Sequence, residues 1–115
     1  MPAPGQVVLF LFPKADATPG KLRPALLLGM LPGRHGDWLV CMVSSQFHQF
    51  VDGFDEIVSE DSEDYQSSGL KMPSVLRIGR LAVMEGSVFV GSIGEIASSR
   101  LERIKIRLSD WLMQR

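Results

Sequence analysis

The residues of this 115-residue chain best suited to chemistry are cations and hydroxyl groups at the ends of apolar runs. Arg23 directly precedes Pro24 and the apolar run 25–28, whose composition predicts burial. An arginine does not enter a protein core unpaired, because the loss of hydration of its charge costs too much free energy. Arg23 is therefore expected at the rim of the core, paired with a carboxylate or facing an anion. Its forked donors and permanent charge suit a phosphate group.

Other polar side chains are expected at the same rim. Ser44 and Ser45 follow the apolar run 38–43, and Arg77 and Arg80 interrupt a later run. A nucleophilic serine needs a neighbouring base, which the sequence does not supply, so the two serines are more simply polar residues at a strand end. The arginines have two interpretations, as contacts to an anion or as salt bridges with acidic residues.

The two histidines, His35 and His48, invite an acid–base pair of the kind that cleaves RNA, but nothing in the sequence brings them together. We expect both in or beside exposed turns. The chain has no Cys/His cluster with metal-ligand spacing, and the segment 91–94 (GSIG) matches no phosphate-loop fingerprint. We therefore expect no metal and no cofactor, and a bulge or turn at 91–94.

The composition predicts one globular domain over residues 1–115, with 45% hydrophobic and 22% charged residues. The single cysteine, Cys41, excludes an internal disulfide, and its apolar neighbours suit a buried thiol in a reducing compartment. The apolar run 7–12 is too short to span a membrane, and no basic leader precedes it. We expect a cytoplasmic protein with no membrane partner.

The charged residues are unevenly distributed along the chain. Seven acids and no base lie between Asp52 and Asp64, whereas the remaining chain has 12 basic and six acidic residues. A basic face opposite an acidic edge is therefore compatible with the net charge of −1, and a polyanionic partner is not excluded. The simpler alternative is a solvated acidic loop.

Short apolar runs separated by glycine and proline predict a mainly β protein. Strands are expected at 6–12, 23–31, 38–46, 74–84 (bent at Gly79) and 87–93, with weaker strands at 55–58 and 64–66. A loop is expected at 14–21 and a turn at 32–37. Pro24 has to lie near the start of its strand or on a sheet edge, because it cannot donate to a central ladder.

The hydrophobic period becomes helical near the C-terminus. The apolar positions are Leu101, Ile104, Leu108, Trp111 and Leu112, and the basic residues Arg100, Arg103, Lys105 and Arg107 fall largely off this stripe. Ser99 and Glu102 have the spacing of a capping box, so the helix is expected to begin near Ser99. These elements predict a small, strongly bent sheet or barrel with the terminal helix packed on it.

The order of these segments closely resembles the PemK/MazF family of toxin ribonucleases over essentially the whole chain. The segments that carry the resemblance are GQVVLFLFP, KLRPALLLG, VCMVSSQ, SGLKMPSVLRIGRLAVM, VGSIGEI and a terminal helix that begins around LERI. The most specific pieces are RPAL after the first loop and GLKMPSVLR before the bent strand. One piece alone would be a weak match, but six in the right order and spacing make it strong.

The resemblance implies a small SH3-like barrel of the CcdB/MazF type, acting as a homodimer that cleaves single-stranded RNA without a metal. It implies attack of the ribose 2′-hydroxyl on the adjacent phosphodiester, which leaves a cyclic phosphate and a free 5′-hydroxyl. In this scheme Arg23 stabilises the scissile phosphate and Ser44 positions it, while Arg77, Ser45 and Lys21 contact the RNA. An acidic, partly disordered antitoxin is expected to bind the same rim.

Three positions depart from the family pattern. Gly79 stands where some relatives have an aspartate, so an aspartate-dependent acid–base scheme does not carry over. Ser44 replaces the commoner threonine and keeps the hydroxyl, and Gln6 replaces an acidic residue. Base selection is expected from residues 14–22 and 47–53.

Two other kinds of protein remain open at this stage. One is a non-catalytic binding protein on the same fold, directed at DNA gyrase as the CcdB toxins are, or binding an antitoxin without activity. The other is a structural barrel whose rim arginines only pair with acids.

Overall fold

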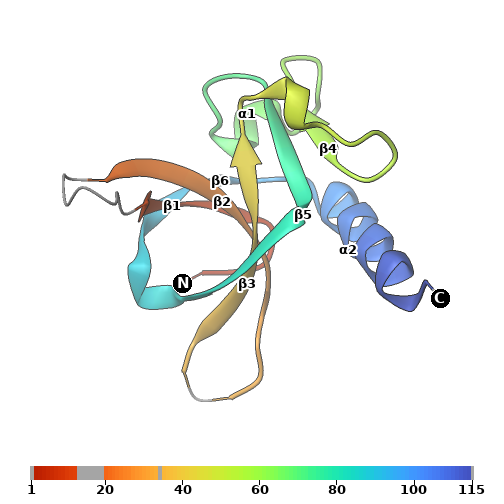
Figure 1. Cartoon of the computed structure of the whole chain (residues 1–115). Helices are drawn as coiled ribbons and strands as arrows, with labels where there is room; N and C mark the ends of the chain where they lie inside the picture. The colour runs from red at the N-terminus through yellow and green to blue at the C-terminus, as the bar shows by residue number, and fades with distance from the viewer. Residues whose placement is uncertain (1, 13–19, 34, 115) are drawn as a thin grey trace.

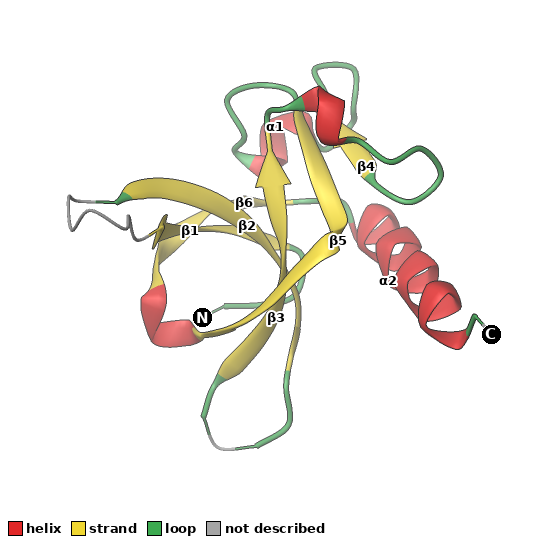
Figure 2. Cartoon of the chain, in the orientation of Figure 1, coloured by secondary structure: helices red, strands yellow, loops and turns green. Residues whose placement is uncertain are grey.

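The computed structural model describes residues 2–12, 20–33 and 35–114, and it is mainly β with one long C-terminal helix (Figures 1 and 2). Six antiparallel strands form one sheet in the order β4-β5-β3-β2-β1-β6. The strands are β1 (Gln6–Phe12), β2 (Lys21–Met30), β3 (Asp37–Ser44), β4 (Glu56–Val58), β5 (Ser74–Glu85) and β6 (Phe89–Glu95). The helices are η1 (Phe47–Gln49), α1 (Tyr65–Ser68), η2 (Gly86–Val88) and α2 (Ser98–Met113). No helix in the described ranges is long and apolar enough to cross a bilayer.

The apolar runs of the central strands are continuous because both faces of the bent sheet are buried. One face packs against α2, and the other lies inside the curve of the sheet. The first cluster includes Val7, Leu26, Leu76, Ile78, Ile104 and Leu108, and the second includes Val8, Phe10, Ala25, Leu27, Trp38 and Val40. Successive residues of one strand therefore pack into different clusters, because side chains alternate between the two faces of a sheet.

Most of the predicted strands are confirmed, and the differences lie at their ends. The strand at 6–12 matches β1, and β4 begins one residue after the predicted 55. β2 begins two residues before the predicted 23, and β6 begins two residues after the predicted 87. The strand predicted at 64–66 is wrong, because this segment forms the short helix α1. The predicted loop 14–21 falls mostly outside the described residues.

Two irregularities predicted at glycines are confirmed. In β5 the pairing with β3 jumps from Leu81 to Arg77, so residues 78–80 form the bend. In β6 the pairing with β1 skips Ile93, which is a bulged residue. The buried Asp55 supports the bend, because its Oδ1 accepts the N–H of Ile78 at 3.0 Å.

The start of α2 differs from the prediction. The N-cap is Ala97, and no side chain of its own segment caps the helix, so the predicted Ser99–Glu102 capping box is wrong. Asp64 replaces it from a distant part of the chain, because its Oδ2 accepts the Ala97 N–H at 2.9 Å. Trp111 and Leu112 are more than half exposed, although the helical stripe predicted them on the buried face.

A buried ionic cluster fixes α2 to the acidic segment. Arg100 is only 8% exposed, and it donates to both oxygens of Asp64 at 2.7 and 3.0 Å and to Glu56 Oε1 at 2.9 Å. Arg103 and Arg107 also pair with Glu56. We call these five residues the Arg100 cluster. Its existence corrects the prediction that Arg100 lies off the packed face, and it excludes the alternative that the acidic segment is only a solvated loop, because Asp55, Glu56 and Asp64 are buried.

The pKa values within the Arg100 cluster follow from this pairing. Burial alone would raise the pKa of the Asp64 carboxyl, but the hydrogen bonds from Arg100 and Ala97 and the Arg100 charge outweigh burial and hold the pKa below its usual value. Burial likewise opposes the charge of Arg100, and Asp64 and Glu56 outweigh it, so the pKa of Arg100 is raised. Outside the cluster, burial raises the pKa of the Cys41 thiol to about 12, which makes it an inert core residue.

Asp64→Ala is expected to lower the free energy of unfolding by about 3–5 kcal/mol, because it leaves Arg100 buried without its main partner. Urea unfolding followed by circular dichroism measures this. The matched control is Arg103→Ala in the same cluster, whose side chain is half exposed, and it is expected to cost about 1 kcal/mol or less. Equal losses in the two variants would contradict the role given to burial.

The acid stability of the protein is expected to depend on Asp64. Its pKa is lowered in the folded state, so its contribution is complete above the unfolded value of about 3.9 and is lost as the pH falls through the folded value. Unfolding free energies measured from pH 6 to pH 2 should therefore fall more steeply in the wild type than in Asp64→Asn. Parallel curves would exclude this linkage.

Candidate functional site

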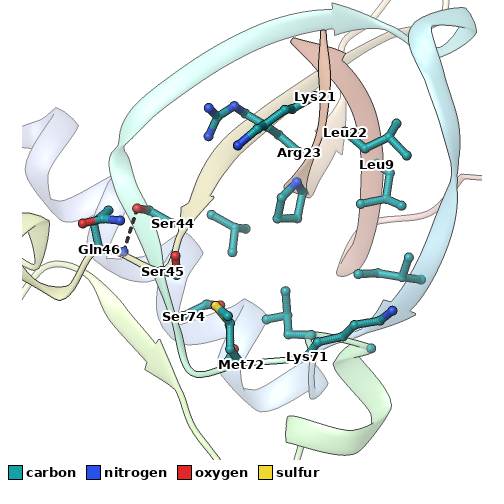
Figure 3. Close-up of a pocket in the computed structure, with 15 residues that line it drawn as sticks. Leu9, Lys21, Leu22, Arg23, Ser44, Ser45, Gln46, Lys71, Met72 and Ser74 are labelled. Atoms are coloured by element: carbon teal, nitrogen blue, oxygen red, sulfur yellow. Dashed lines mark hydrogen bonds between the residues drawn. The ribbon is translucent and has the colours of Figure 1, made fainter.

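The main pocket of the described chain opens where the ladder between β2 and β3 ends. The last pair of this ladder is Ala25 opposite Met42, and Pro24, which has no N–H to donate, directly precedes it. Beyond this pair a pocket of about 490 Å³ lies between the two strand ends. Its lining residues are Leu9, Lys21, Leu22, Arg23, Pro24, Val43, Ser44, Ser45, Gln46, Gly69, Leu70, Lys71, Met72, Ser74 and Ile93 (Figure 3).

Four of the five predicted site residues line this pocket. Lys21 and Arg23 lie on one side of it, and Ser44 and Ser45 lie where β3 ends (Figure 3). The fifth, Arg77, is not a lining residue, but it pairs with Met42 across β3 and β5. Because paired residues and residues two apart in a strand share a face, Arg77 lies on the same face as Ser44.

The hydroxyl of Ser44 is held in place by its own chain. Gln46 donates its backbone N–H to Ser44 Oγ at 3.0 Å, a local turn that fixes the oxygen at the end of β3 (Figure 3). Since the oxygen accepts this bond, the hydroxyl proton can be donated to a ligand. Arg23 is an exposed side chain on the facing strand. The pocket therefore presents a cation and a hydroxyl donor, which is a suitable arrangement for an oxyanion.

Residues 69–72 form the opposite wall of the pocket, and the sequence analysis gave them no chemical role. Lys71 and Met72 are exposed there, facing Lys21 and Arg23 across the opening (Figure 3). Both residues fall within the segment SGLKMPSVLR, which contributed to the resemblance only as a sequence match. The signal that the sequence analysis missed is a lysine followed directly by a large apolar residue, Lys71 and Met72.

Two glycines allow this wall to approach β6. Gly69 has φ +74°, and an added Cβ would lie 2.0 Å from the Ile93 carbonyl oxygen. At Gly94 an added Cβ would lie 2.1 Å from the carbonyl oxygen of Ser67. The Ser67 hydroxyl also donates to the backbone carbonyl oxygen of Glu95 at 3.0 Å. The two backbones are therefore in contact, and this contact sets the position of the wall.

The remaining candidates lie elsewhere. His35 precedes β3 and His48 lies in η1 after it, so the two exposed histidines are at opposite ends of one strand and neither lines the pocket. Within residues 2–12, 20–33 and 35–114, no three His, Cys, Asp or Glu side chains are grouped so as to hold a metal ion. Gly79 lines a different cavity with Phe10, Met42 and Arg80.

The sequence matches the family described as PemK-like, MazF-like toxin of type II toxin-antitoxin system over residues 3–112. The chain therefore belongs to this family, as the order of its segments predicted. No curated protein sequence gives a match.

Solved structures show the same fold at low sequence identity. The toxin MazF-mt6 of Mycobacterium tuberculosis aligns with a TM-score of 0.60 and 16% identity, covering 93% of this chain and 95% of that one. The MazE–MazF complex of Deinococcus radiodurans contains a chain that aligns with a TM-score of 0.68 and 24% identity, covering 98% and 97%. The predicted fold class, a mainly β chain of the MazF type with a C-terminal helix, is thereby confirmed.

Gly94→Ala is expected to destabilise the protein by about 1–3 kcal/mol or more, because the new methyl group would overlap the Ser67 carbonyl oxygen and force the wall away from β6. Gly91→Ala in the same strand is the control, since an added Cβ there meets nothing within 4 Å. Thermal unfolding of both variants measures the difference. A Gly94→Ala variant as stable as Gly91→Ala would contradict the contact.

Proposed function

We propose that this chain is a toxin endoribonuclease that cleaves single-stranded RNA by attack of the ribose 2′-hydroxyl on the adjacent phosphodiester. The observation that carries the proposal is that Arg23 and Ser44 line one open pocket, on the two strand ends that flank it. In this reaction the nucleophile belongs to the substrate, so the protein needs no activated serine. It has to hold the phosphate and stabilise the negative charge that grows on it.

The roles of the two residues follow from their chemistry. The Arg23 guanidinium binds the phosphoryl oxygens, on which charge increases in the transition state. The Ser44 hydroxyl, fixed by the Gln46 N–H, donates a hydrogen bond to the same phosphate and orients it for attack. The new bond joins the 2′-oxygen to phosphorus, and the bond to the 5′-oxygen breaks, which leaves a cyclic phosphate and a 5′-hydroxyl. Lys21, Ser45 and Arg77 contact the RNA around this linkage.

We also propose an antitoxin partner and a homodimer. The Deinococcus radiodurans relative is seen in a MazE–MazF complex, and the family belongs to toxin–antitoxin systems. Of the residues that line the pocket, three are cations and none is an acid. Such a pocket suits an acidic inhibitor segment that folds on binding and excludes the substrate.

Arg23→Ala and Ser44→Ala are each expected to lower the rate of RNA cleavage about 100- to 1,000-fold, because each removes a preorganised donor to the transition state. Ser44→Thr should retain most activity, since it keeps the hydroxyl. The measurement is cleavage of mixed single-stranded RNA by purified protein with EDTA present, with detection of cyclic phosphate ends. Lys105→Ala, a cation on α2 outside this pocket, is the control and should cleave as the wild type does.

Three outcomes would count against this function. Undiminished cleavage by Arg23→Ala would refute its assignment. Growth arrest with intact RNA in expressing cells would indicate a gyrase-directed toxin. Neither arrest nor cleavage would indicate an inactive antitoxin-binding protein.

A further inference from the structure

The wall of the pocket formed by residues 69–72 is held by the segment that precedes it. The helix α1 ends at Ser68 and Gly69 follows directly, so a movement of α1 carries the wall with it. The Ser68 hydroxyl donates to the Tyr65 carbonyl oxygen at 2.6 Å and accepts the Leu70 N–H at 3.2 Å. The helix α1 and the wall therefore form one short unit, whose position depends on what α1 contacts.

Asp64 joins the start of this unit to α2. Its carboxylate accepts the N–H of Ala97 and two hydrogen bonds from the Arg100 guanidinium, while its backbone carbonyl accepts the Ser68 N–H at 2.9 Å. One residue thus holds the first turn of α2 with its side chain and closes α1 with its main chain. Asp64 is only 3% exposed, so water competes little for its carboxylate.

Ser67 joins the same unit to β6. Its hydroxyl lies 3.0 Å from the backbone carbonyl oxygen of Glu95 and 3.1 Å from that of Asp64, and it donates to both. Glu95 ends β6 and Ala97 caps α2, so the unit is attached on both sides of the link between these two elements. The wall also touches β6 at the two glycines described above.

We propose that Asp64 and Ser67 are positioning residues for the pocket, which set the distance between its wall and the strand that carries Arg23. Neither residue lines the pocket, and both act through α1. Lys71 on the wall and Arg23 on β2 lie on opposite sides of the opening, so a displaced wall changes the width of the pocket and the spacing of its cations (Figure 3). The inference rests on the proposed function only for the effect of such a displacement on RNA cleavage.

The position of the wall is measured without any substrate. Spin labels are attached at Lys71→Cys on the wall and at Met30→Cys on β2, two exposed sites, and the distance between the labels is recorded by pulsed electron paramagnetic resonance. The native Cys41 is buried and does not react with the label. The labelled protein with no further substitution should give a narrow distance distribution. Asp64→Ala should broaden or shift this distribution, because it releases α1 from α2.

Ser67→Ala tests the same unit with a smaller loss of stability, since Ser67 is exposed and the change removes one hydroxyl group. It should also broaden or shift the distribution. Leu108→Ala is the control for stability, because it leaves a cavity under the C-terminal half of α2 and should leave the label distances unchanged. Ser87→Ala, which removes the hydrogen bond from the Ser87 hydroxyl to Glu85, is the control for Ser67→Ala.

The kinetics of RNA cleavage give a second measurement on the same variants. Asp64→Ala and Ser67→Ala should raise KM about fivefold, the factor that one phosphate contact to a single strand contributes near 0.1 M salt. The value of kcat should change little, because Arg23 and Ser44 lie on strands that α1 does not hold. A loss of stability alone would reduce the fraction of folded enzyme, which lowers the apparent kcat and leaves KM unchanged.

The outcomes separate this inference from the proposed activity. Label distances that change as expected in a protein whose wild type cleaves no RNA would support the positioning role and refute the nuclease. Unchanged distances in Ser67→Ala and in a folded Asp64→Ala, or equal changes in Leu108→Ala, would overturn the inference whatever the protein does to RNA. If Asp64→Ala does not fold, Ser67→Ala alone decides. Changed distances with an unchanged KM in a cleaving protein would also overturn it.

Discussion

The pairing of Arg100 with Asp64 and Glu56 is the interaction on which the arrangement of this chain depends. It joins the first turn of α2 to two points of the acidic segment, and Asp64 also accepts the N–H of Ala97 at the helix start. A buried ion pair of this kind contributes little net free energy, but the loss of one partner is costly. The Arg100 cluster therefore serves mainly to fix the position of the segment between β4 and β5.

That position determines which charges remain at the pocket. The buried acids of the acidic segment have partners that do not line the pocket. Glu56 and Asp64 are bound to arginines of α2, and Asp55 accepts the N–H groups of Val51 and Ile78. The chain between Asp64 and β5 contributes Lys71 and Met72 to the pocket, while Glu56 and Asp64 pair with Arg100 of α2. Of the residues that line the pocket, three are cations and none is an acid.

The sequence predicted the parts of the fold that depend on local patterns. The apolar runs located β1 to β3 and β5, and the helical period located α2, because these elements bury side chains in a regular alternation. The sequence did not predict α1, the trans cap from Asp64 or the burial of Arg100, because each depends on a contact between residues distant in the chain. Trp111 was wrongly assigned to the buried face. The helical period identifies which side chains share a stripe, but it does not show how far along the helix the sheet covers that stripe.

The candidate site was predictable to a similar extent. Arg23 was identified because a charged residue before a buried run has to stay at the rim, whereas the position of Ser44 predicted only a polar strand end and its role came from the family resemblance. Nothing in their spacing shows that the ladder ends at Ala25 and opens a pocket between them, which depends on the pairing of β2 with β3. Lys71 and Met72 were missed because residues 69–72 become part of the site only through the contact with β6.

The contact of Gly69 and Gly94 has a consequence for how such pockets diverge among relatives. Each glycine meets a backbone carbonyl of the opposing segment, so a larger residue at either position cannot be accommodated by trimming a side chain on the other. The depth and width of the pocket therefore cannot change gradually through substitutions at these two positions. A relative that carries a side chain at either position needs a differently routed chain there, and with it a differently shaped recess.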